Sequence, residues 1–194
     1  MKMNIQRCVE NALMVFCLFF SVPMAAQQQL SALVPLPNTI ERQEGYWTVG
    51  EKVQIVAHVD RDAFCLQRLQ EVLQDRLACT TVLKAEIEAA ASDVVVRLDA
   101  AMEGQEHYIL EINREGIVLT GASEAALFWG VQTLDQLLLG DGENTSRRRM
   151  SCVRIDDAPR FAYRALMLDP ARHFLPIADV KRYIDQMVCY KYNV

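Results

Sequence analysis

The chain has 194 residues, of which 52% are hydrophobic and 23% are charged, and its formal net charge is −5. This composition is typical of a globular protein with enough apolar material for a core, and it excludes an intrinsically disordered chain. Phosphate recognition requires a clustered basic surface, whereas the one basic run here is Arg147-Arg148-Arg149. We therefore expect no nucleic-acid partner and interpret that run as a solvated loop.

The first 26 residues have the pattern of a secretory signal peptide. Lys2 and Arg7 precede an apolar block from Ala12 to Val22, and small residues follow at Ala25-Ala26. The apolar block is shorter than the roughly 20 residues that a membrane span needs. We predict cleavage after Ala26, export to the periplasm or the exterior, and no membrane span after signal cleavage. An uncleaved anchor is the open alternative.

The next segments predict two strands and a helix. Tyr46 to Val49 and Val53 to Ala57 are interpreted as short strands on either side of Gly50. Apolar residues recur every three or four positions from Asp62 to Ala78, which predicts an amphipathic helix that Asp60 or Asp62 caps. Its apolar face consists of Leu66, Leu69, Leu73 and Leu77.

The middle of the chain predicts more strands and a second helix. Val94 to Leu98 is a β-branched strand, and Tyr108 to Ile112 with Ile117 to Thr120 is a hairpin around a loop that contains Gly116. Ser123 is expected to cap a helix that runs to about Leu139. Its apolar face consists of Leu127, Phe128, Val131, Leu134 and Leu138. We expect strands first and then helices on one sheet face, with a linker at residues 140–150.

The cysteine pattern indicates no metal site. Cys8 and Cys17 belong to the expected signal peptide, and the other four of the six cysteines have no paired metal-type spacing. Those four are Cys65, Cys79, Cys152 and Cys189. Two of them fall on one predicted helix about 20 Å apart, too far for a disulfide. We expect buried free thiols, no metal and no cofactor.

The last part of the chain predicts a strand, a turn and a helix. Ala165 to Leu168 is a short apolar run, and a polar turn with Asp169, Arg172 and His173 follows it. Pro176 fits the first turn of an amphipathic helix, and the chain becomes apolar again at Tyr192 to Val194. This is a βα unit that leads into a second strand. In a (β/α)8 barrel, active sites lie at such charged strand ends.

Two stretches resemble glycoside hydrolase family 20. Glu106-His107-Tyr108-Ile109-Leu110, together with Ala126 to Leu138, resembles its non-catalytic N-terminal domain. Ile155 to Phe161 and Met167 to Phe174 resemble the start of its catalytic barrel, and this second match is the more specific. The resemblance implies an α+β N-terminal domain, with a sheet covered by two helices, followed by the first βα unit of a truncated (β/α)8 TIM barrel. The expected ranges are 1–26 for the signal peptide, 30–150 for the N-terminal domain and 159–194 for the incomplete barrel.

The same resemblance implies a β-N-acetylhexosaminidase that removes terminal N-acetylglucosamine or N-acetylgalactosamine from glycans. The family's arginine in the Arg-His-Phe motif binds sugar hydroxyls, and this role carries over to Arg172 as the substrate-binding residue. A guanidinium suits that role because its rigid fork of donors engages two neighbouring hydroxyls. One departure is Ala165, where the family commonly has glycine after the arginine that matches Arg164.

No catalytic residue is assigned within the chain. Family 20 enzymes use the acetamido oxygen of the substrate as nucleophile, so they need a glutamic acid to protonate the leaving oxygen and an aspartate to orient the acetamido group. That Asp-Glu pair has no counterpart here, and neither Asp169 nor Asp179 matches its motif. We expect a fragment that is inactive alone, in which the front domain folds by itself and the residues after about Arg160 either pack on that domain or stay labile.

Two other functions are open. The chain is alternatively a secreted carbohydrate-binding or interaction module whose barrel start is a remnant, or a remnant of another glycosidase family with a similar front domain. Without the resemblance, Arg172 is simply an ion-pair partner of Asp169. His173, Phe128 and Trp129 are expected to pack against apolar neighbours. The remaining histidines, His58 and His107, are expected to be structural or exposed.

Overall fold

A computed structural model describes residues 33–84, 93–139 and 148–194. The expected signal peptide and most of the expected linker lie outside these described residues. The elements are β1 (Thr39–Thr48), β2 (Lys52–His58), α3 (Phe64–Leu77), β3 (Thr80–Lys84), β4 (Val94–Leu98), β5 (Tyr108–Ile112), β6 (Ile117–Gly121), α4 (Glu124–Leu139), β7 (Arg149–Asp157) and α5 (Ile177–Cys189).

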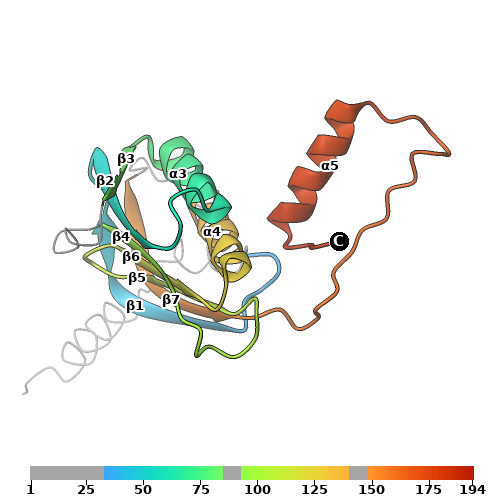
Figure 1. Ribbon diagram of the computed structural model, residues 1–194. Helices are drawn as coiled ribbons and strands as arrows, with labels where there is room; N and C mark the ends of the chain where they lie inside the picture. The colour runs from blue at the N-terminus through green and yellow to red at the C-terminus, as the bar shows by residue number, and fades with distance from the viewer. Residues whose placement is uncertain (1–32, 85–92, 140–147) are drawn as a thin grey trace, which may run out of the picture.

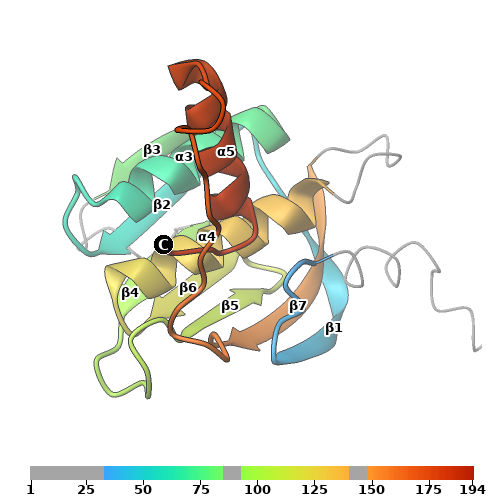
Figure 2. The same ribbon diagram turned by 90° about the vertical axis from the view of Figure 1, so that its right-hand side faces the viewer.

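The strands form one mixed sheet in the order β1-β7-β5-β6-β4-β2-β3. The pairs β1–β7, β7–β5 and β5–β6 are antiparallel, and the pairs β6–β4, β4–β2 and β2–β3 are parallel. Helices α3 and α4 lie side by side over one sheet face (Figures 1 and 2). The α+β domain with two covering helices is therefore confirmed. The expected order of strands before helices is wrong, because α3 is the crossover between the parallel strands β2 and β3.

Helix α3 buries the predicted apolar face. Leu66, Leu69, Leu73 and Leu77 are all in the core. The predicted cap is wrong: the residue before the helix is Ala63, which has no side chain to cap it. The Asp60 carboxylate instead accepts a hydrogen bond from the backbone N–H of Asp62 at 3.2 Å, and so stabilises the turn that leads into the helix.

Helix α4 begins as predicted, because the Ser123 hydroxyl accepts a hydrogen bond from the backbone N–H of Ala126 at 3.2 Å. The helix also carries buried polar groups. Asp135 accepts bonds from Arg68 at 2.8 Å and from Arg76 at 2.6 Å, both on α3. The two helices are therefore joined by ion pairs as well as by apolar packing.

The hairpin β5–β6 is confirmed, and Gly116 in its loop has a structural reason. A side chain at this position would overlap the backbone carbonyl of Asp93, which accepts a hydrogen bond from the N–H of Ile117 at 2.8 Å.

Two strands, β3 and β7, were not expected. The end of the front domain expected at residue 150 falls inside β7, which continues the sheet to Asp157.

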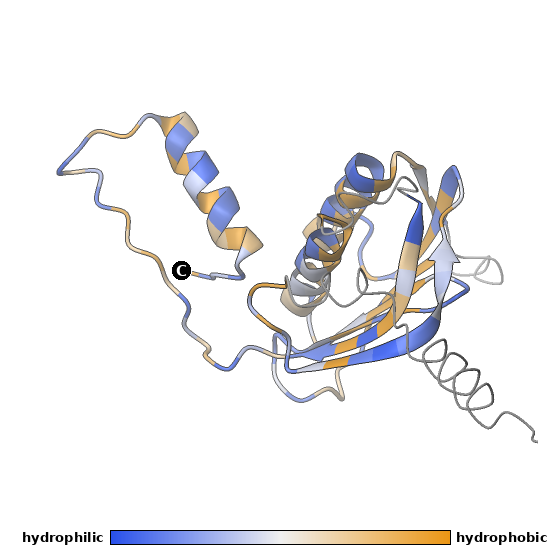
Figure 3. Ribbon diagram, turned by 180° about the vertical axis from the view of Figure 1, so that it is seen from behind, coloured by the Kyte–Doolittle hydropathy of each residue, from blue (hydrophilic) through white to orange (hydrophobic). Residues whose placement is uncertain are grey.

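The chain after β7 leaves the two-layer domain as an extended segment and returns through α5 (Figures 1 and 3). The predicted helix is confirmed, with Pro176 just before its first residue, but none of its residues is buried. The predicted strand from Ala165 to Leu168 is wrong: no strand forms, and Met167 is 89% exposed. A strand of a parallel barrel needs a neighbouring strand on each edge and packed elements on both faces. This segment has a backbone partner at one point only.

That point is a short backbone pairing with the end of the chain. The N–H groups of Asn193 and Val194 donate to the carbonyl of Arg164 at 2.9 and 3.2 Å, and the N–H of Leu166 donates to the carbonyl of Val194 at 3.2 Å. Two of these bonds flank Ala165 as in a parallel ladder. The expected approach of a second strand is therefore visible as one parallel contact. Among the described helices, none is long and apolar enough to cross a membrane.

Candidate functional site

The turn that the sequence singled out, here called the Arg172 turn (residues 169–174), lies at the exposed far end of the extended segment. The Arg172 side chain is 90% exposed, and its Nε lies 3.5 Å from Oδ2 of Asp169. His173 and Phe174 are also exposed, so the expected packing of His173 is wrong. Arg172 therefore presents its guanidinium to solvent with one loose ion pair, and its sugar-binding role stays a prediction.

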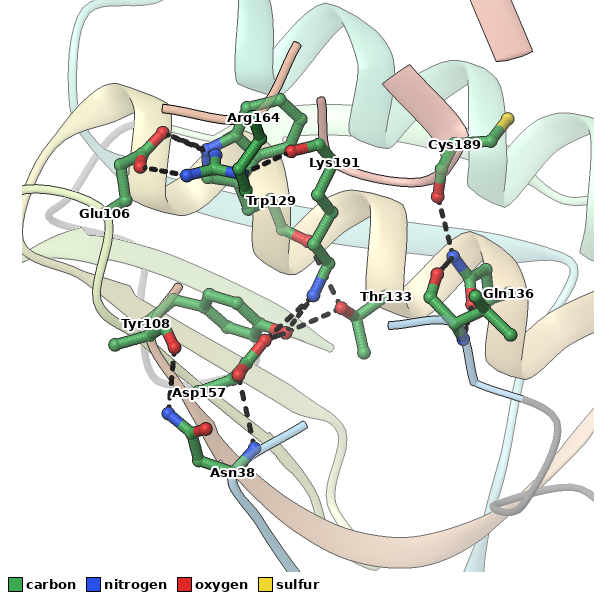
Figure 4. Close-up of polar contacts among 12 residues, drawn as sticks. Asn38, Glu106, Tyr108, Trp129, Thr133, Gln136, Asp157, Arg164, Cys189 and Lys191 are labelled. Atoms are coloured by element: carbon green, nitrogen blue, oxygen red, sulfur yellow. Dashed lines mark hydrogen bonds and ion pairs between the residues drawn. The ribbon is translucent and has the colours of Figure 1, made fainter. Parts of the chain in front are cut away.

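A second group of polar residues gathers where the extended segment and the end of α5 meet the front domain. We call it the junction cluster, and Figure 4 shows its side chains pointing toward one another. Its members are Glu106, Tyr108, Trp129, Thr133, Asp157, Arg164 and Lys191.

The inner half of the junction cluster surrounds the ammonium group of Lys191. This group donates to Oδ2 of Asp157 at 2.9 Å and to the hydroxyl oxygen of Tyr108 at 2.8 Å. The Tyr108 hydroxyl donates to the same Asp157 oxygen at 2.9 Å and lies 2.6 Å from the hydroxyl of Thr133. The other Asp157 oxygen accepts from the backbone N–H of Asn38 at 3.2 Å. A buried cation is thus matched by one buried carboxylate.

Burial sets the protonation behaviour of this inner half. It lowers the pKa of Lys191, and the neighbouring Asp157 opposes that change because the carboxylate favours the charged ammonium. Burial, together with the charge of Asp157, raises the pKa of Tyr108 well above its usual value. The tyrosine therefore keeps its proton and acts as a hydrogen-bond donor at neutral pH.

The outer half is built on the guanidinium of Arg164. Its Nη1 and Nη2 donate to the two oxygens of Glu106 at 2.8 and 3.0 Å, and its Nε donates to the carbonyl of Lys191 at 2.6 Å. The indole N–H of Trp129 donates to Glu106 at 2.8 Å. The hydrogen bond from Arg164 is the main reason that the pKa of Glu106 lies below its usual value. The carboxylate therefore stays ionised.

A cleft of about 380 Å³ opens at the junction cluster, and Pro35, Leu36, Trp129 and Phe161 are among the residues that line it. Its walls are largely apolar. The two carboxylates that line it, Glu106 and Asp157, already bind Arg164 and Lys191. Both carboxylates of the cleft are therefore neutralised by cations within the protein.

Other chemistry-bearing residues have structural surroundings. Cys65, Cys79 and Cys152 are free and buried, and burial raises the pKa of each thiol, whereas Cys189 is free and half-buried. The free thiols are as predicted. Within residues 33–84, 93–139 and 148–194, no group of three or more His, Cys, Asp and Glu side chains could hold a metal ion.

Trp129 and His107 also have structural contacts. Trp129 packs in the core as predicted and is 7% exposed. The Nε2 of His107 lies 2.8 Å from Oδ1 of Asp156, which ties the start of β5 to β7. The structural interpretation of His107 is therefore supported by a specific contact.

Sequence reasoning missed the junction cluster. Its members come from the segment before β5, from the first residue of β5, from α4, from the end of β7 and from both sides of α5, and no local spacing connects them. One signal was present: α4 carries the uncharged polar residues Gln132, Thr133 and Gln136 in a largely apolar helix. Gln136 illustrates their use, because its amide nitrogen donates to the carbonyls of Val34 and Cys189, both at 2.7 Å.

Two regions of the chain match known families in sequence. Residues 30–158 match glycosyl hydrolase family 20, domain 2, and residues 161–194 match the catalytic domain of glycosyl hydrolase family 20. The chain is 30% identical over 170 residues to a β-hexosaminidase of Porphyromonas gingivalis, an alignment that covers 83% of the chain and 21% of that relative. It is 32% identical over 164 residues to a β-hexosaminidase of Vibrio furnissii, covering 84% of the chain and 25% of that relative.

Solved structures agree in fold. A GH20 exo-β-N-acetylglucosaminidase from Vibrio harveyi, solved in complex with N-acetylglucosamine, has a TM-score of 0.69 at 26% identity and covers 84% of this chain and 25% of its own. The GH20 β-N-acetylhexosaminidase from Streptomyces coelicolor has a TM-score of 0.68 at 32% identity, covering 84% and 34%. The chain thus spans between a fifth and about a third of the length of these similar proteins.

Proposed function

The chain belongs to glycosyl hydrolase family 20, and from this premise we propose that it is the N-terminal part of a β-N-acetylhexosaminidase. Such an enzyme removes terminal N-acetylglucosamine or N-acetylgalactosamine from glycans. The observation that carries the proposal is the uninterrupted order of the two matches, domain 2 at residues 30–158 and the catalytic domain at residues 161–194. The names of the similar proteins support the substrate class.

In this proposal Arg172 binds the sugar. Its guanidinium is exposed, and its ion pair with Asp169 has an N–O distance of 3.5 Å. An exposed pair of that length contributes little, at most about 1 kcal/mol, so a sugar displaces it at low cost. The guanidinium N–H groups then donate hydrogen bonds to two neighbouring sugar hydroxyls in one fixed orientation. Arg172 acts in binding and takes no part in proton transfer.

Hydrolysis itself needs the family's Asp-Glu pair, whose motif has no counterpart among the 194 residues. Family 20 enzymes use the substrate's acetamido oxygen as nucleophile, which requires an acid and a second carboxylate to orient that group. Glu106 and Asp157 are poor candidates, because each already neutralises a cation of the junction cluster. We therefore propose that the 194 residues do not hydrolyse glycosides by themselves and that the Asp-Glu pair belongs to a complete barrel.

Export is part of the same proposal. It is supported by the basic, apolar and small-residue order of residues 1–26, which lie outside the described residues. N-terminal sequencing of the protein recovered from the producing cells tests it. A mature chain that begins at Gln27 is the expected result, and a chain that still begins at Met1 in the cytoplasm contradicts export.

The nucleotide sequence after the codon for Val194 is the most direct test of the parent enzyme. We expect the reading frame of the gene to continue into a second barrel strand and, further on, an Asp-Glu pair. Unrelated sequence at that position would contradict the proposed enzyme and favour a binding module with a remnant of the barrel.

A chromogenic N-acetylglucosaminide tests the activity. The 194-residue chain is expected to show no turnover above a heat-denatured control, while a barrel-complete form is expected to release the chromophore. In that form Arg172→Lys should lower kcat/KM about ten- to hundredfold, because a charged, forked hydrogen bond is lost. Arg182→Lys, on the exposed face of α5, is the matched control and should leave kcat/KM unchanged.

A further inference from the structure

The proposed chemistry uses Arg172 and leaves the junction cluster unexplained. Arg164 lies earlier on the same extended segment, and its guanidinium is bonded to three parts of the chain. It binds Glu106 in the front domain and the carbonyl of Lys191 after α5 (Figure 4). It also donates to the carbonyl of Phe161 at 2.8 Å. One side chain therefore holds together the front domain and both ends of the βα unit.

The backbone of Arg164 is held as firmly as its side chain. Its N–H donates to the side-chain oxygen of Asn193 at 3.0 Å, and its carbonyl accepts from Asn193 and Val194. The side-chain nitrogen of Asn193 donates to the carbonyl of Ala162 at 2.8 Å. The only described parallel pairing of the barrel start thus uses the carbonyl of the residue that binds Glu106.

Lys191 provides the second connection. It follows α5 and has a left-handed backbone conformation, with a φ of 60°, from which its side chain enters the front domain and binds Asp157 and Tyr108. Between Arg164 and Lys191, helix α5 has no buried residue, and it makes few contacts with α4. The described polar contacts that attach the βα unit to the front domain are therefore those of two cations, Arg164 and Lys191, and the bond from Gln136 on α4 to the Cys189 carbonyl.

We propose that Arg164 and Lys191 form a two-point clamp by which the front domain positions the first βα unit of the barrel, and with it the Arg172 turn. Arg164 is in this sense a positioning residue, and Glu106 is its anchor. The hydroxyl of Tyr183 on α5 donates to the carbonyl of Met167 at 3.1 Å and links the clamp to the segment that leads to the turn. The sugar-binding part of this inference rests on the proposed function, whereas the clamp itself does not.

The clamp requires the forked shape of an arginine. A lysine at position 164 would keep the charge but would offer one compact donor group, which does not reach both Glu106 oxygens and the Lys191 carbonyl in fixed directions. Arg164→Lys is therefore the central variant. Glu106→Gln is the second, because it removes the anchor charge with little change in shape. Arg182→Lys is the control, since Arg182 forms an exposed ion pair with Asp179.

The first measurement uses the indole N–H of Trp129, which donates to Glu106. The chain has two tryptophans, so a ¹⁵N–¹H correlation spectrum of the 194-residue protein contains two indole cross-peaks. Arg164→Lys and Glu106→Gln should each shift the Trp129 cross-peak. The cross-peak of Trp47, which is buried in β1, should stay in place and report that the front domain is folded. Arg182→Lys should move neither.

The second measurement is amide hydrogen exchange at Leu166, Asn193 and Val194, whose N–H groups form the parallel pairing. Arg164→Lys should speed exchange there about tenfold or more, because a charge-assisted bidentate bond no longer opposes local opening. Exchange in α4 and β5 should not change.

Unchanged exchange and an unchanged Trp129 cross-peak in both variants would overturn the clamp. Exchange that rises equally in α4 would also overturn it, since the role of Arg164 would then be general stability rather than positioning. Neither measurement uses a sugar or a turnover. Absence of hexosaminidase activity in a barrel-complete form would therefore overturn the proposed function and leave the clamp standing.

Discussion

Arg164 and Glu106 are separated by 58 positions in the sequence, yet their side chains are joined by two hydrogen bonds of 2.8 and 3.0 Å. Glu106 belongs to the front domain, and Arg164 belongs to the start of the barrel. Both side chains are largely screened from water, with exposed fractions of 15% and 18%. The relative position of the two regions thus depends on a polar contact at their junction, in addition to apolar packing.

Acid is expected to weaken this contact. The pKa of Glu106 in the folded protein lies below its usual value of 4.5, chiefly because Arg164 donates to it. A carboxylate with a lowered folded pKa adds stability that is fully present above the unfolded pKa and is lost as the pH falls through the folded pKa. We therefore expect the junction to loosen below about pH 4.5.

An acid titration of the Trp129 indole cross-peak measures this loosening. The cross-peak should shift below that pH in the parent chain and should show no such step in Glu106→Gln. A titration curve that is identical in the two proteins would contradict the expectation.

Removal of the Lys191 cation is expected to be costly. Lys191→Met leaves the Asp157 carboxylate buried without a counter-charge, since the two side chains are only 7% and 11% exposed. Breaking a buried pair in this way lowers the free energy of unfolding by about 3 kcal/mol. Urea unfolding at pH 7 measures the loss.

A double-mutant cycle separates the pair from its surroundings. Lys191→Met combined with Asp157→Asn should cost less than the sum of the two single changes, because no uncompensated charge remains buried. Arg182→Met removes an exposed pair and should change the free energy of unfolding by about 0.5 kcal/mol or less. Strictly additive single costs would show that the two charges do not stabilise each other.

Gly116→Ala is expected to destabilise the β5–β6 hairpin. A methyl group at this position would overlap the carbonyl of Asp93 in the neighbouring chain segment, so the backbone would have to move. We expect a loss of about 2 kcal/mol in the free energy of unfolding, measured by urea denaturation.

Gly104→Ala is the matched control for the hairpin variant. Gly104 also has a positive φ, of 86°, but no atom lies within 4 Å of the added methyl position. Only the cost of the backbone conformation, about 1 kcal/mol, should appear there. Equal losses in the two variants would rule out the Asp93 contact as the cause at Gly116.

Trypsin is expected to cut the βα unit before the front domain. Arg172 is exposed, and Lys181 and Arg182 lie on α5, which has no buried residue. The sites on α3, at Arg68 and Arg76, are held by ion pairs to Asp135. A time course analysed by mass spectrometry should therefore show early fragments that end at Arg172, Lys181 or Arg182 and a surviving front domain. Equal cleavage rates on α3 and α5 would contradict this difference.

Several elements could be predicted because their causes are local. Each of these patterns involves residues that are close in the sequence: the spacing of leucines in α3, the Ser123 cap of α4 and the alternation around Gly116. Helical and strand periodicities depend on short-range geometry, so one sequence is enough to detect them. The Arg-His-Phe motif also identified the family, since it is contiguous.

Strand β7 and the segment from Ala165 to Leu168 could not be predicted, because their structure depends on distant partners. The residues of β7 include four charged side chains, and the segment is a strand because β1 and β5 pair with its two edges. The run from Ala165 to Leu168 is apolar, yet it forms no strand, because only one backbone pairing reaches it. Strand formation depends on partners that are distant in the sequence, and local pattern alone does not identify them.

The sequence by itself determined the family, the two covering helices and the hairpin, and it singled out Arg172, whose guanidinium we propose binds the sugar. Only the tertiary structure decided how the barrel start is attached, because Glu106, Asp157, Arg164 and Lys191 come together through the sheet, α4 and the return of α5. A charged residue that is far from its partner in the chain looks like any solvated charge. Its role becomes visible when folding brings it to an opposite charge and removes both from water.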